Sequence, residues 1–407
     1  MANLKDLKVN HESYISLHVQ LHNLLRQLIV SGHWRNGDRI PSEPQLAQSL
    51  KISRSTVRIA LQSAELEGLI TRSPGRGTFV TYQPGKRQNT QYIGYVTRNF
   101  HNDIHRVLLS STETELRSAD YRVIFSNAHN NDEEVLVLQQ LLDDNIQGLI
   151  LWPNANPTAD QIDILQRYRA LGIPIVFVDR RVDGIEADYV ASDNFGGTVN
   201  LVSHLVELGH RHILYLCSNI RNLFPIEERL RGYRAVVHQH HLHAYQPLLI
   251  NSPPHNFFLE ADIHTLLDTS SDELIAQIIE LLQKVEPLPT AIACVNDALA
   301  ILTMRALKRM GLQVPTDISV VGFDDIDLAA YMPVPLTTVL QDAHTIGQVA
   351  ARLLLDRLDG FSVPPRHEVV PTHLQIRMSS STPISSITSL SAETAIWKEE
   401  TDGEKRQ

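Results

Sequence analysis

Hydrophobic positions near the start of the chain follow the pattern of a small helical module that ends in a β-hairpin. Apolar residues recur at helical spacing over 14–29, and a short helix is predicted over 43–50 with Ser42 at its N-cap. A further helix begins at Ser53, so the two helices form a tight helix-turn-helix. Two β-rich runs joined by a turn that contains Pro and Gly follow and predict a hairpin. This order of elements predicts a winged helix-turn-helix domain over residues 12–82.

Beyond this module the pattern changes to continuous apolar strands that alternate with amphipathic helices. Residues 83–91 contain no apolar residue and predict a linker. Continuous apolar strands between helices indicate parallel sheets covered on both faces, and the segment is long for one sheet, so we expect two similar α/β lobes over 92–377. The Ser/Thr-rich and then charged residues 379–407 predict a disordered tail. The strand-like runs lie at 92–96, 121–127, 148–152, 174–179, 212–217, 247–251, 290–295 and 318–323.

Length and composition fit a soluble protein. The 407 residues are enough for two or three domains, each with an apolar core. No apolar run approaches the roughly 18 residues of a membrane span, and the polar start lacks the apolar segment of a secretory signal. Cys217 and Cys294 lie inside apolar runs, so we expect buried thiols rather than a disulfide. Together these features predict a cytoplasmic protein without membrane contact.

The formal net charge of −10 is unevenly divided along the chain. Of the 36 Lys+Arg and 46 Asp+Glu, 12 and 6 lie in residues 1–90, which leaves 24 and 40 for the remainder. A basic head on an acidic body is typical of a nucleic-acid-binding module joined to a module that binds something else. A chance fluctuation of surface charge would give the same numbers, so the case depends on motifs.

The second helix of the helix-turn-helix carries the residues expected to read DNA. Arg54 and Arg58 are four positions apart and share a helical face, so both can enter one groove. An arginine fork matches guanine or phosphate, and hydroxyls reach either. A solvated helix face and an ordinary glycine turn are the alternative. The candidates are Ser53, Arg54, Ser55, Thr56 and Arg58 on the helix, and Gly75, Arg76 and Gly77 at the tip of the hairpin.

These motifs resemble the winged-helix domain of GntR-family transcription regulators. The resemblance rests on GDRIPSE (37–43), LAQSLKISRSTVRIAL (46–61), LEGLI (66–70) and GRGTFV (75–80). It implies a dimer on operator DNA, with Ser42 and Glu43 added to the candidate contacts. Many members place a phosphate-binding Arg after this Ser-Glu pair, whereas this chain has Pro44. Pro is well tolerated in a first helical turn, but it cannot make the phosphate contact of that Arg.

Polar residues follow several predicted strands of the larger domain, where open α/β sheets bind ligands. Asp179 follows one strand, Asp297 follows another, and Asp324 follows a third. Asp193 and Asp297 could instead be helix N-caps. Arg229 lies near the start of a helix, where a cation gains nothing from the helix dipole, so we expect a specific partner or a surface salt bridge.

The order of motifs over 91–377 resembles the sugar-binding core of LacI/GalR-type repressors. The motifs include PIVFVDRR, YVASDNFGG, EERLRGY, PTAIACVNDALAI and VPTDISVVGFDDID. The resemblance implies a two-lobed, doubly wound α/β domain of the periplasmic-binding-protein type that dimerises and closes on a small ligand. It also implies that Arg229 and Asp297 hold ligand hydroxyls, with Asp179 and Asp324 as further candidates that could stabilise loops instead. Together with the head, this domain resembles the architecture of arabinose-responsive repressors of the GntR type.

Sugar sites also use an aromatic face. The candidates are Phe100, Trp152 and Phe224, each of which could equally pack in a core or between lobes. The loop that contains Phe100 departs from the first-strand loop usual in the family, which leaves the identity of the ligand open.

The remaining signals favour a regulator over an enzyme. The cluster His238, His240, His241 and His243 is either a solvated helix end or, less favoured, a metal site. The sequence has no HExxH, P-loop, GxSxG, CxxC or GxGxxG motif, so we expect neither catalysis nor a cofactor. The prediction is a homodimeric, operator-binding repressor controlled by a small molecule, most simply a sugar. The alternatives are an activator, or a ligand-binding or enzymatic module whose head makes only protein contacts.

Overall fold

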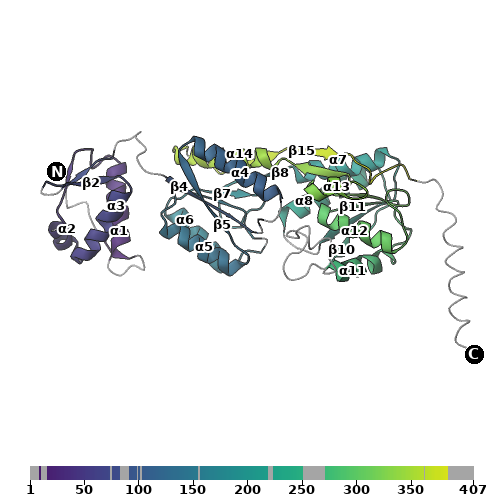
Figure 1. Cartoon of the computed structure of the whole chain (residues 1–407), viewed down its shortest axis with the longest axis horizontal. Coiled ribbons are helices and arrows are strands. Elements are labelled where there is room, and N and C mark those ends of the chain that lie inside the picture. Colours follow the sequence, from purple (N-terminus) through teal and green to yellow (C-terminus); the bar gives the residue numbers. More distant parts are fainter. Residues whose placement is uncertain are drawn as a thin grey trace, which may run out of the picture. The chain divides into compact units, whose positions relative to one another are not determined.

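The chain folds into two compact units, residues 1–91 and residues 92–407, in a computed structural model (Figure 1). We describe each unit separately. The structure describes residues 9–10, 16–73, 76–82, 91–98, 100, 103–154, 156–218, 223–250, 271–361 and 363–383.

The first unit is the predicted winged helix. Ser53 Oγ accepts a 3.0 Å hydrogen bond from the backbone N–H of Thr56, which confirms Ser53 as a helix N-cap. Lys51 adopts a left-handed conformation with φ of 54°, which makes the tight turn between the two helices. Apolar side chains from all three helices and the sheet form one core. The elements are α1 (Leu17–Val30), β1 (Arg39–Ile40), α2 (Glu43–Leu50), α3 (Arg54–Leu66), β2 (Ile70–Ser73) and β3 (Gly77–Val80), with antiparallel strand order β1-β3-β2.

The second unit begins with a lobe built on a six-stranded sheet of order β14-β8-β7-β6-β4-β5. The pairs from β14 to β4 are parallel, and helices lie on both faces, as the apolar strand pattern predicts. The strands are β4 (Gln91–Thr97), β5 (Tyr121–Asn127), β6 (Gly148–Leu151), β7 (Ile175–Val178), β8 (Asp188–Ser192) and β14 (His367–Val370). The helices are α4 (Asp103–Ser118), α5 (Asn131–Asp143), α6 (Ala159–Ala170) and α14 (Ala343–Leu358).

The second lobe has a four-stranded parallel sheet of order β10-β9-β11-β12. Its strands form the largest apolar cluster of the chain together with the surrounding helices. The strands are β9 (Ile213–Ser218), β10 (Leu248–Ile250), β11 (Ala291–Cys294) and β12 (Ser319–Val321). The helices are α7 (Asn194–Glu207), α8 (Phe224–Gln239), α11 (Asp272–Leu282), α12 (Asp297–Arg309) and α13 (Asp327–Tyr331). Cys217 and Cys294 are buried free thiols, as predicted.

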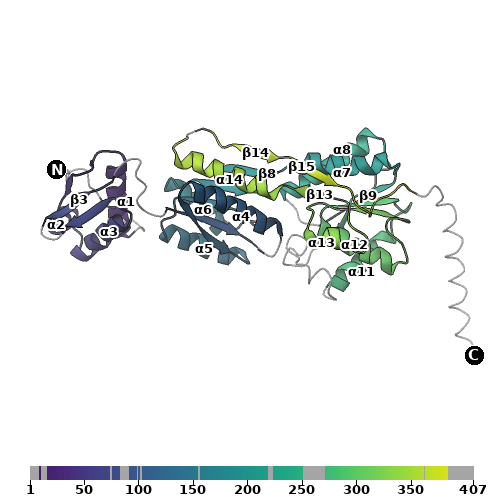
Figure 2. The ribbon, with the colours of Figure 1, turned by 45° about the horizontal axis from the view of Figure 1, so that its top comes forward.

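Three chain segments pass between the lobes. The first follows β8 into α7, and the second follows β13 (Thr338–Gln341) into α14. The third joins β14 to β15 (Thr372–Gln375), which pairs antiparallel with β13 and lies beside α7 (Figure 2). Each lobe is assembled from segments far apart in sequence. A structural change in one lobe is therefore transmitted to the other through these crossings and the contacts beside them.

The structure differs from the sequence prediction at the C-terminus and in five strands. Ser379 is fully buried, its hydroxyl donates to the carbonyl oxygen of Val320, and Ser381 N–H donates to Ser319 Oγ. The predicted tail over 379–407 therefore starts too early, because residues 379–381 bond to β12; residues 384–407 lie outside the described part. Gln91, which the sequence prediction assigned to the linker over 83–91, is the first residue of β4. Residues 83–90 lie outside the described part of the chain. Strands β1, β8, β13, β14 and β15 were not among the predicted strand-like runs. Across the described residues, no helix is both long and apolar enough to cross a membrane.

Candidate functional site

The N-terminal turn of α3 presents the predicted DNA-reading residues. Arg54 and Arg58 are exposed, whereas Val57, Ala60 and Leu61 of the same helix are buried. The amphipathic pattern therefore holds one face of α3 against the core and turns the arginines outward. The hydroxyls at the helix start form one cluster, in which Ser53 Oγ lies 2.7 Å from both Ser55 Oγ and Thr56 Oγ1.

Glu43 lies between two arginines of this head. Its carboxylate is 3.5 Å from Arg58 Nε and 3.7 Å from Arg72 Nη1. Arg72 also lies 3.3 Å from a carboxylate oxygen of Glu65 and donates to the backbone carbonyl of Arg58. A carboxylate held against two cations is repelled by phosphate, so this geometry favours Glu43 as a residue that positions Arg58. The sequence prediction missed Arg72, because its partners on α2 and α3 are distant in sequence.

The hairpin tip brings a further arginine to the wing. Gly77 has φ of +115°, and a Cβ added there would lie 2.9 Å from Arg39 Nε, so the arginine packs directly on the glycine backbone. Arg76 is exposed beside it. Gly75, predicted to contact DNA, lies outside the described residues. Arg39 was not among the predicted contacts, since nothing in its local sequence shows that β1 pairs with β3.

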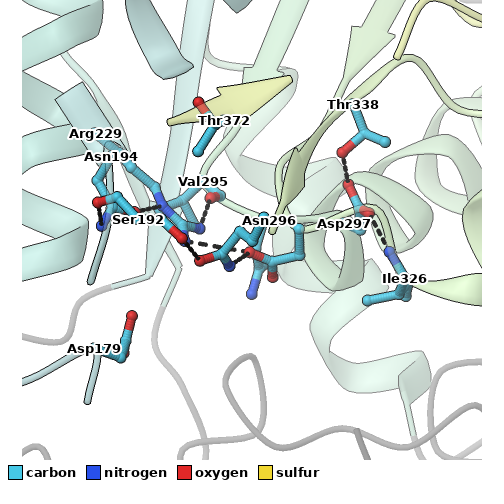
Figure 3. A network of polar contacts seen from close by, with 12 residues as sticks. Asp179, Ser192, Asn194, Arg229, Val295, Asn296, Asp297, Ile326, Thr338 and Thr372 are labelled. Atoms are coloured by element: carbon cyan, nitrogen blue, oxygen red, sulfur yellow. Dashed lines mark hydrogen bonds and ion pairs between the residues drawn. The ribbon is translucent and has the colours of Figure 1, made fainter. Parts of the chain in front are cut away.

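In the larger unit, Arg229 is the centre of a buried polar network (Figure 3). Its side chain on α8 is only 6% exposed and lies over the Phe323 ring at 3.8 Å. Its Nε donates to Asn194 Oδ1 at 2.7 Å, its Nη1 donates to the Val295 carbonyl at 2.8 Å, and its Nη2 lies 3.2 Å from Asp324 Oδ1. The partner expected from its unfavourable place near a helix start is therefore present, and the guanidinium is fixed in orientation.

Asp324 is held in an unusual backbone conformation next to Arg229. Its φ is +121°, and that of Asp325 is +53°, in a region that non-glycine residues seldom occupy. Asp324 Oδ1 also accepts a 2.7 Å hydrogen bond from Gln341 Nε2. Burial raises the pKa of Asp324 to about 6, although Arg229 opposes the shift. Asp325 forms an ion pair with Arg377 at 2.7 Å.

Asp297, predicted as a direct ligand contact, is wholly buried and bonded to Ile326 and to Thr338, the first residue of β13 (Figure 3). Oδ2 accepts from the backbone N–H of Ile326 at 3.0 Å, and Oδ1 accepts from the Thr338 hydroxyl at 2.5 Å. Burial raises the pKa of Asp297 well above its ordinary range, and Asp324 adds to the shift. These contacts favour a role in holding the loop that carries Asp324. The helix is capped by the residue before it, since Asn296 Oδ1 accepts from the Leu299 N–H.

Asp179 brings a carboxylate from the first lobe toward the same place (Figure 3). It follows β7 with φ of +63°, and its Oδ2 lies 3.3 Å from Arg180 Nε. Burial raises the pKa of Asp179, and both Arg180 and Arg229 act against that rise. Asp179 in turn raises the pKa of Asp324. Carboxylates from both lobes therefore share the electrostatic field of one arginine.

A second set of polar side chains lies at the end of the first-lobe sheet that also carries Asp179. Arg98, just after β4, donates to Asn154 Oδ1 at 2.6 Å. Glu134 on α5 is 3% exposed and accepts a 2.7 Å hydrogen bond from Gln161 Nε2 on α6. Burial raises the pKa of Glu134 to about 7, while Arg98 and Arg180 oppose the rise. The sequence prediction missed this group because Glu134 lies inside an ordinary helical pattern.

The three aromatic candidates lie in different surroundings. Phe100 packs on Phe125, with ring centroids 4.7 Å apart, and Trp152 packs on His105 at 4.1 Å. Phe224, the first residue of α8 in the second lobe, packs against the core of the first lobe and lies 4.9 Å from the Arg181 guanidinium. Phe224 therefore serves as a contact between the lobes.

Of the four histidines in the cluster over 238–243, His243 packs against other aromatic rings. His243 stacks on His212 at 5.2 Å and meets Tyr245 edge-on at 4.3 Å. Within the described residues, no group of three or more His, Cys, Asp or Glu side chains is arranged to hold a metal ion.

Both units match known protein families. Residues 17–80 match the family of bacterial regulatory proteins called gntR, and residues 202–380 match a periplasmic binding protein-like domain. The arabinose metabolism transcriptional repressor of Geobacillus stearothermophilus is 29% identical over 88% of this chain and 96% of its own length. The HTH-type transcriptional regulator GalR of Escherichia coli is 28% identical over 73% of this chain and 81% of its own.

Solved structures share the fold of the larger unit. A LacI family transcriptional regulator from Enterococcus faecium with bound ribose has a TM-score of 0.58 at 23% identity, and covers 72% of this chain and 100% of its own. The CelR–cellobiose complex has a TM-score of 0.61 at 22% identity, over 84% of this chain and 100% of its own. The named relatives are transcription regulators, which agrees with the prediction of a non-enzyme. The chain thus carries an N-terminal domain that matches the bacterial gntR regulatory proteins and a periplasmic-binding-protein-like domain with the fold of LacI family structures, as its sequence predicted.

Proposed function

We propose that this chain is a cytoplasmic, dimeric repressor whose affinity for a palindromic operator is controlled by a sugar. The sugar binds where the two lobes of the larger unit meet. Arg54 and Arg58 of each head enter the major groove, and Arg39 and Arg76 reach phosphate or the minor groove from the wing. The sugar favours one arrangement of the lobes, and that arrangement releases the operator. Switching requires that the sugar bind one arrangement more tightly than the other.

The observation that carries the proposal is the convergence of carboxylates from both lobes on Arg229. Asp324 of the second lobe pairs with Arg229 at 3.2 Å, and Asp179 of the first lobe lies in the same region (Figure 3), where Arg229 opposes the rise that burial gives its pKa. Carboxylates accept hydrogen bonds from hydroxyls, and a guanidinium donates to their oxygens, so the set matches adjacent hydroxyls of a polyol. In this arrangement Asp297 positions the loop, and Arg229, Asp179 and Asp324 contact the sugar.

The comparisons support a sugar as the ligand class. Relatives are named for arabinose metabolism and as GalR, and LacI-type structures were solved with ribose, cellobiose and D-xylulofuranose. The candidates for an aromatic face of the sugar site remain Phe100, Trp152 and Phe224. Trp152 directly follows β6, at the carboxyl end of that strand.

A thermal-shift screen of the full chain tests the ligand class. Arabinose, galactose, ribose, cellobiose, xylulose and their phosphates are added separately, and a true ligand raises the melting temperature. At 100 times its Kd it stabilises the native state by about 2.7 kcal/mol. An Arg229→Met variant is the control and loses the shift. If no sugar shifts the wild-type protein, the ligand class is wrong.

Operator binding is tested separately by titrating the chain against duplex fragments at rising salt. Phosphate contacts make affinity fall steeply with salt, because binding releases counterions. A module whose head makes only protein contacts would show no duplex affinity at any salt concentration. A reporter fused to the operator then distinguishes repression from activation.

A further inference from the structure

Five residues, which include the proposed sugar contacts Arg229 and Asp324, form a closed ring of four hydrogen bonds and one ion pair. The Ser192 hydroxyl donates to Gln341 Oε1 at 2.7 Å, and Gln341 Nε2 donates to Asp324 Oδ1 at 2.7 Å. Asp324 pairs with Arg229 Nη2 at 3.2 Å, and Arg229 Nε donates to Asn194 Oδ1 at 2.7 Å. Asn194 Nδ2 closes the ring on the carbonyl oxygen of Ser192 at 3.1 Å (Figure 3).

The ring includes two of the three segments that cross between the lobes. Ser192 is the last residue of β8 in the first lobe, and the chain then enters α7 of the second. Gln341 is the last residue of β13, and the chain then enters α14 of the first lobe. Arg229 and Asp324 belong to the second lobe alone. The ring therefore joins the residues proposed to bind sugar to the backbone at two crossings.

The chemistry of each link requires the residue found there. A carboxylate only accepts hydrogen bonds, so the amide NH2 of Gln341 must face Asp324 and its oxygen must face the Ser192 hydroxyl. A Glu at 341 would set two carboxylates against each other, and an apolar residue would leave the Ser192 hydroxyl without this partner and remove one of the two contacts to Asp324 Oδ1. Ser192 and Gln341 are buried, so each lost link leaves a polar group without water.

We propose that Ser192 and Gln341 are positioning residues that couple the sugar site to the relative orientation of the lobes. A sugar hydroxyl that bonds to Asp324 or Arg229 competes with the ring bonds to the same atoms. The Gln341 side chain then shifts, and the β13–α14 crossing shifts with it. The ring itself does not depend on the ligand, but its use as a relay rests on the proposed function.

The first test measures lobe orientation without any ligand. Gln166 on α6 and Ala276 on α11 are exposed, one in each lobe, and each is replaced by a spin-labelled cysteine; the natural cysteines are buried. The chain is diluted with unlabelled protein so that only distances within one chain are measured. Ser192→Ala and Gln341→Met each broaden or displace the distance distribution measured by pulsed electron resonance. Distributions identical to that of the parent overturn the proposal.

Two further variants separate coupling from general stability. Ser192→Thr keeps the hydroxyl and retains the parent distribution. The double variant with Ser192→Ala and Gln341→Met changes no more than Gln341→Met alone, because losing the amide already opens both links. Additive effects, or a Thr variant that behaves like Ala, show that these residues only fill space and overturn the proposal.

The second test uses arabinose as the probe, or another sugar from the screen that shifts the wild-type melting temperature. The ratio of operator Kd with and without the sugar falls about 2- to 30-fold in Gln341→Met, as expected for a residue in a coupling network. An unchanged ratio overturns the relay. If no sugar alters operator binding in the wild type, the proposed function fails, whereas the distance measurement still decides whether the ring sets lobe orientation.

Discussion

Glu134→Gln is expected to stabilise the protein in alkaline solution and to have no effect in acid. Glu134 is buried on α5, and burial raises its pKa to about 7 from an ordinary value of 4.5. A glutamine in the same position keeps an oxygen that can accept the bond from Gln161. The substitution therefore removes a buried charge while it retains the local hydrogen bond.

The sign and size of the effect follow from the raised pKa. Between about pH 4.5 and pH 7 the folded protein binds a proton that the unfolded chain has lost, so the Glu134 contribution favours folding less as pH rises. Each pKa unit corresponds to 1.36 kcal/mol, so a shift from 4.5 to about 7 is worth about 3 kcal/mol above pH 8. Glu134→Gln should gain up to about that amount at pH 8.5 and nothing at pH 4.

The measurement is urea unfolding at pH 5, 7 and 8.5, followed by tryptophan fluorescence, since Trp152 lies in the same lobe. Asp132→Asn, which removes an exposed carboxylate from the same helix start, is the matched control and changes stability by the same small amount at each pH. If Glu134→Gln gains no more at pH 8.5 than at pH 5, the carboxyl is not buried as described and the reasoning is refuted.

Three other substitutions test the head, the packing and the loop. Arg58→Ala should weaken operator binding by about 1–3 kcal/mol if it reads a base, whereas a phosphate role would show as a salt slope reduced by about one; titrations at several salt concentrations distinguish these. Gly347→Ala should destabilise the first lobe by about 1–3 kcal/mol or more, because a Cβ would lie 2.5 Å from the Leu108 carbonyl oxygen; a melting temperature equal to wild type would contradict this. Asp297→Ala should leave operator binding intact and abolish the sugar response in a gel-shift assay; loss of DNA binding by the folded variant would show that the division of roles is wrong.

The elements that local pattern could predict are those with a strong hydrophobic period. The helix predicted over 43–50 is α2, and the predicted apolar runs of the larger domain became β4 to β7 and β9 to β12. The missed strand β14 has three exposed residues of four, so its sequence carries no apolar run. β8 begins at Asp188, a buried acid that is satisfied by Arg357 at 2.7 Å, and no local pattern reveals a partner so distant in sequence.

The site was predictable in its residue types and less so in its connections. The expectation of a partner for Arg229 is confirmed, and the alternative reading of Asp193 as an N-cap is confirmed by its 2.7 Å bond from Gly196 N–H. That Asp297 would bond to Thr338 and Ile326 could not be predicted, because the strand and the loop that supply those partners come together only in the folded chain. The role of Gln341 was missed for the same reason.

The sugar site is where this chain departs most from what stability alone would favour. Asp179 and Asp324 both adopt positive φ, and burial raises the pKa of both carboxyls. Strained backbone and buried carboxylates that repel each other are retained only where surrounding contacts hold them and function requires them. A polyol that donates hydroxyls to those carboxylates would relieve part of this repulsion, and it would do so at the atoms that Gln341 and Arg229 already share. Under the proposed function, the same residues that make the unliganded site unfavourable would give a bound sugar its means of shifting the two lobes.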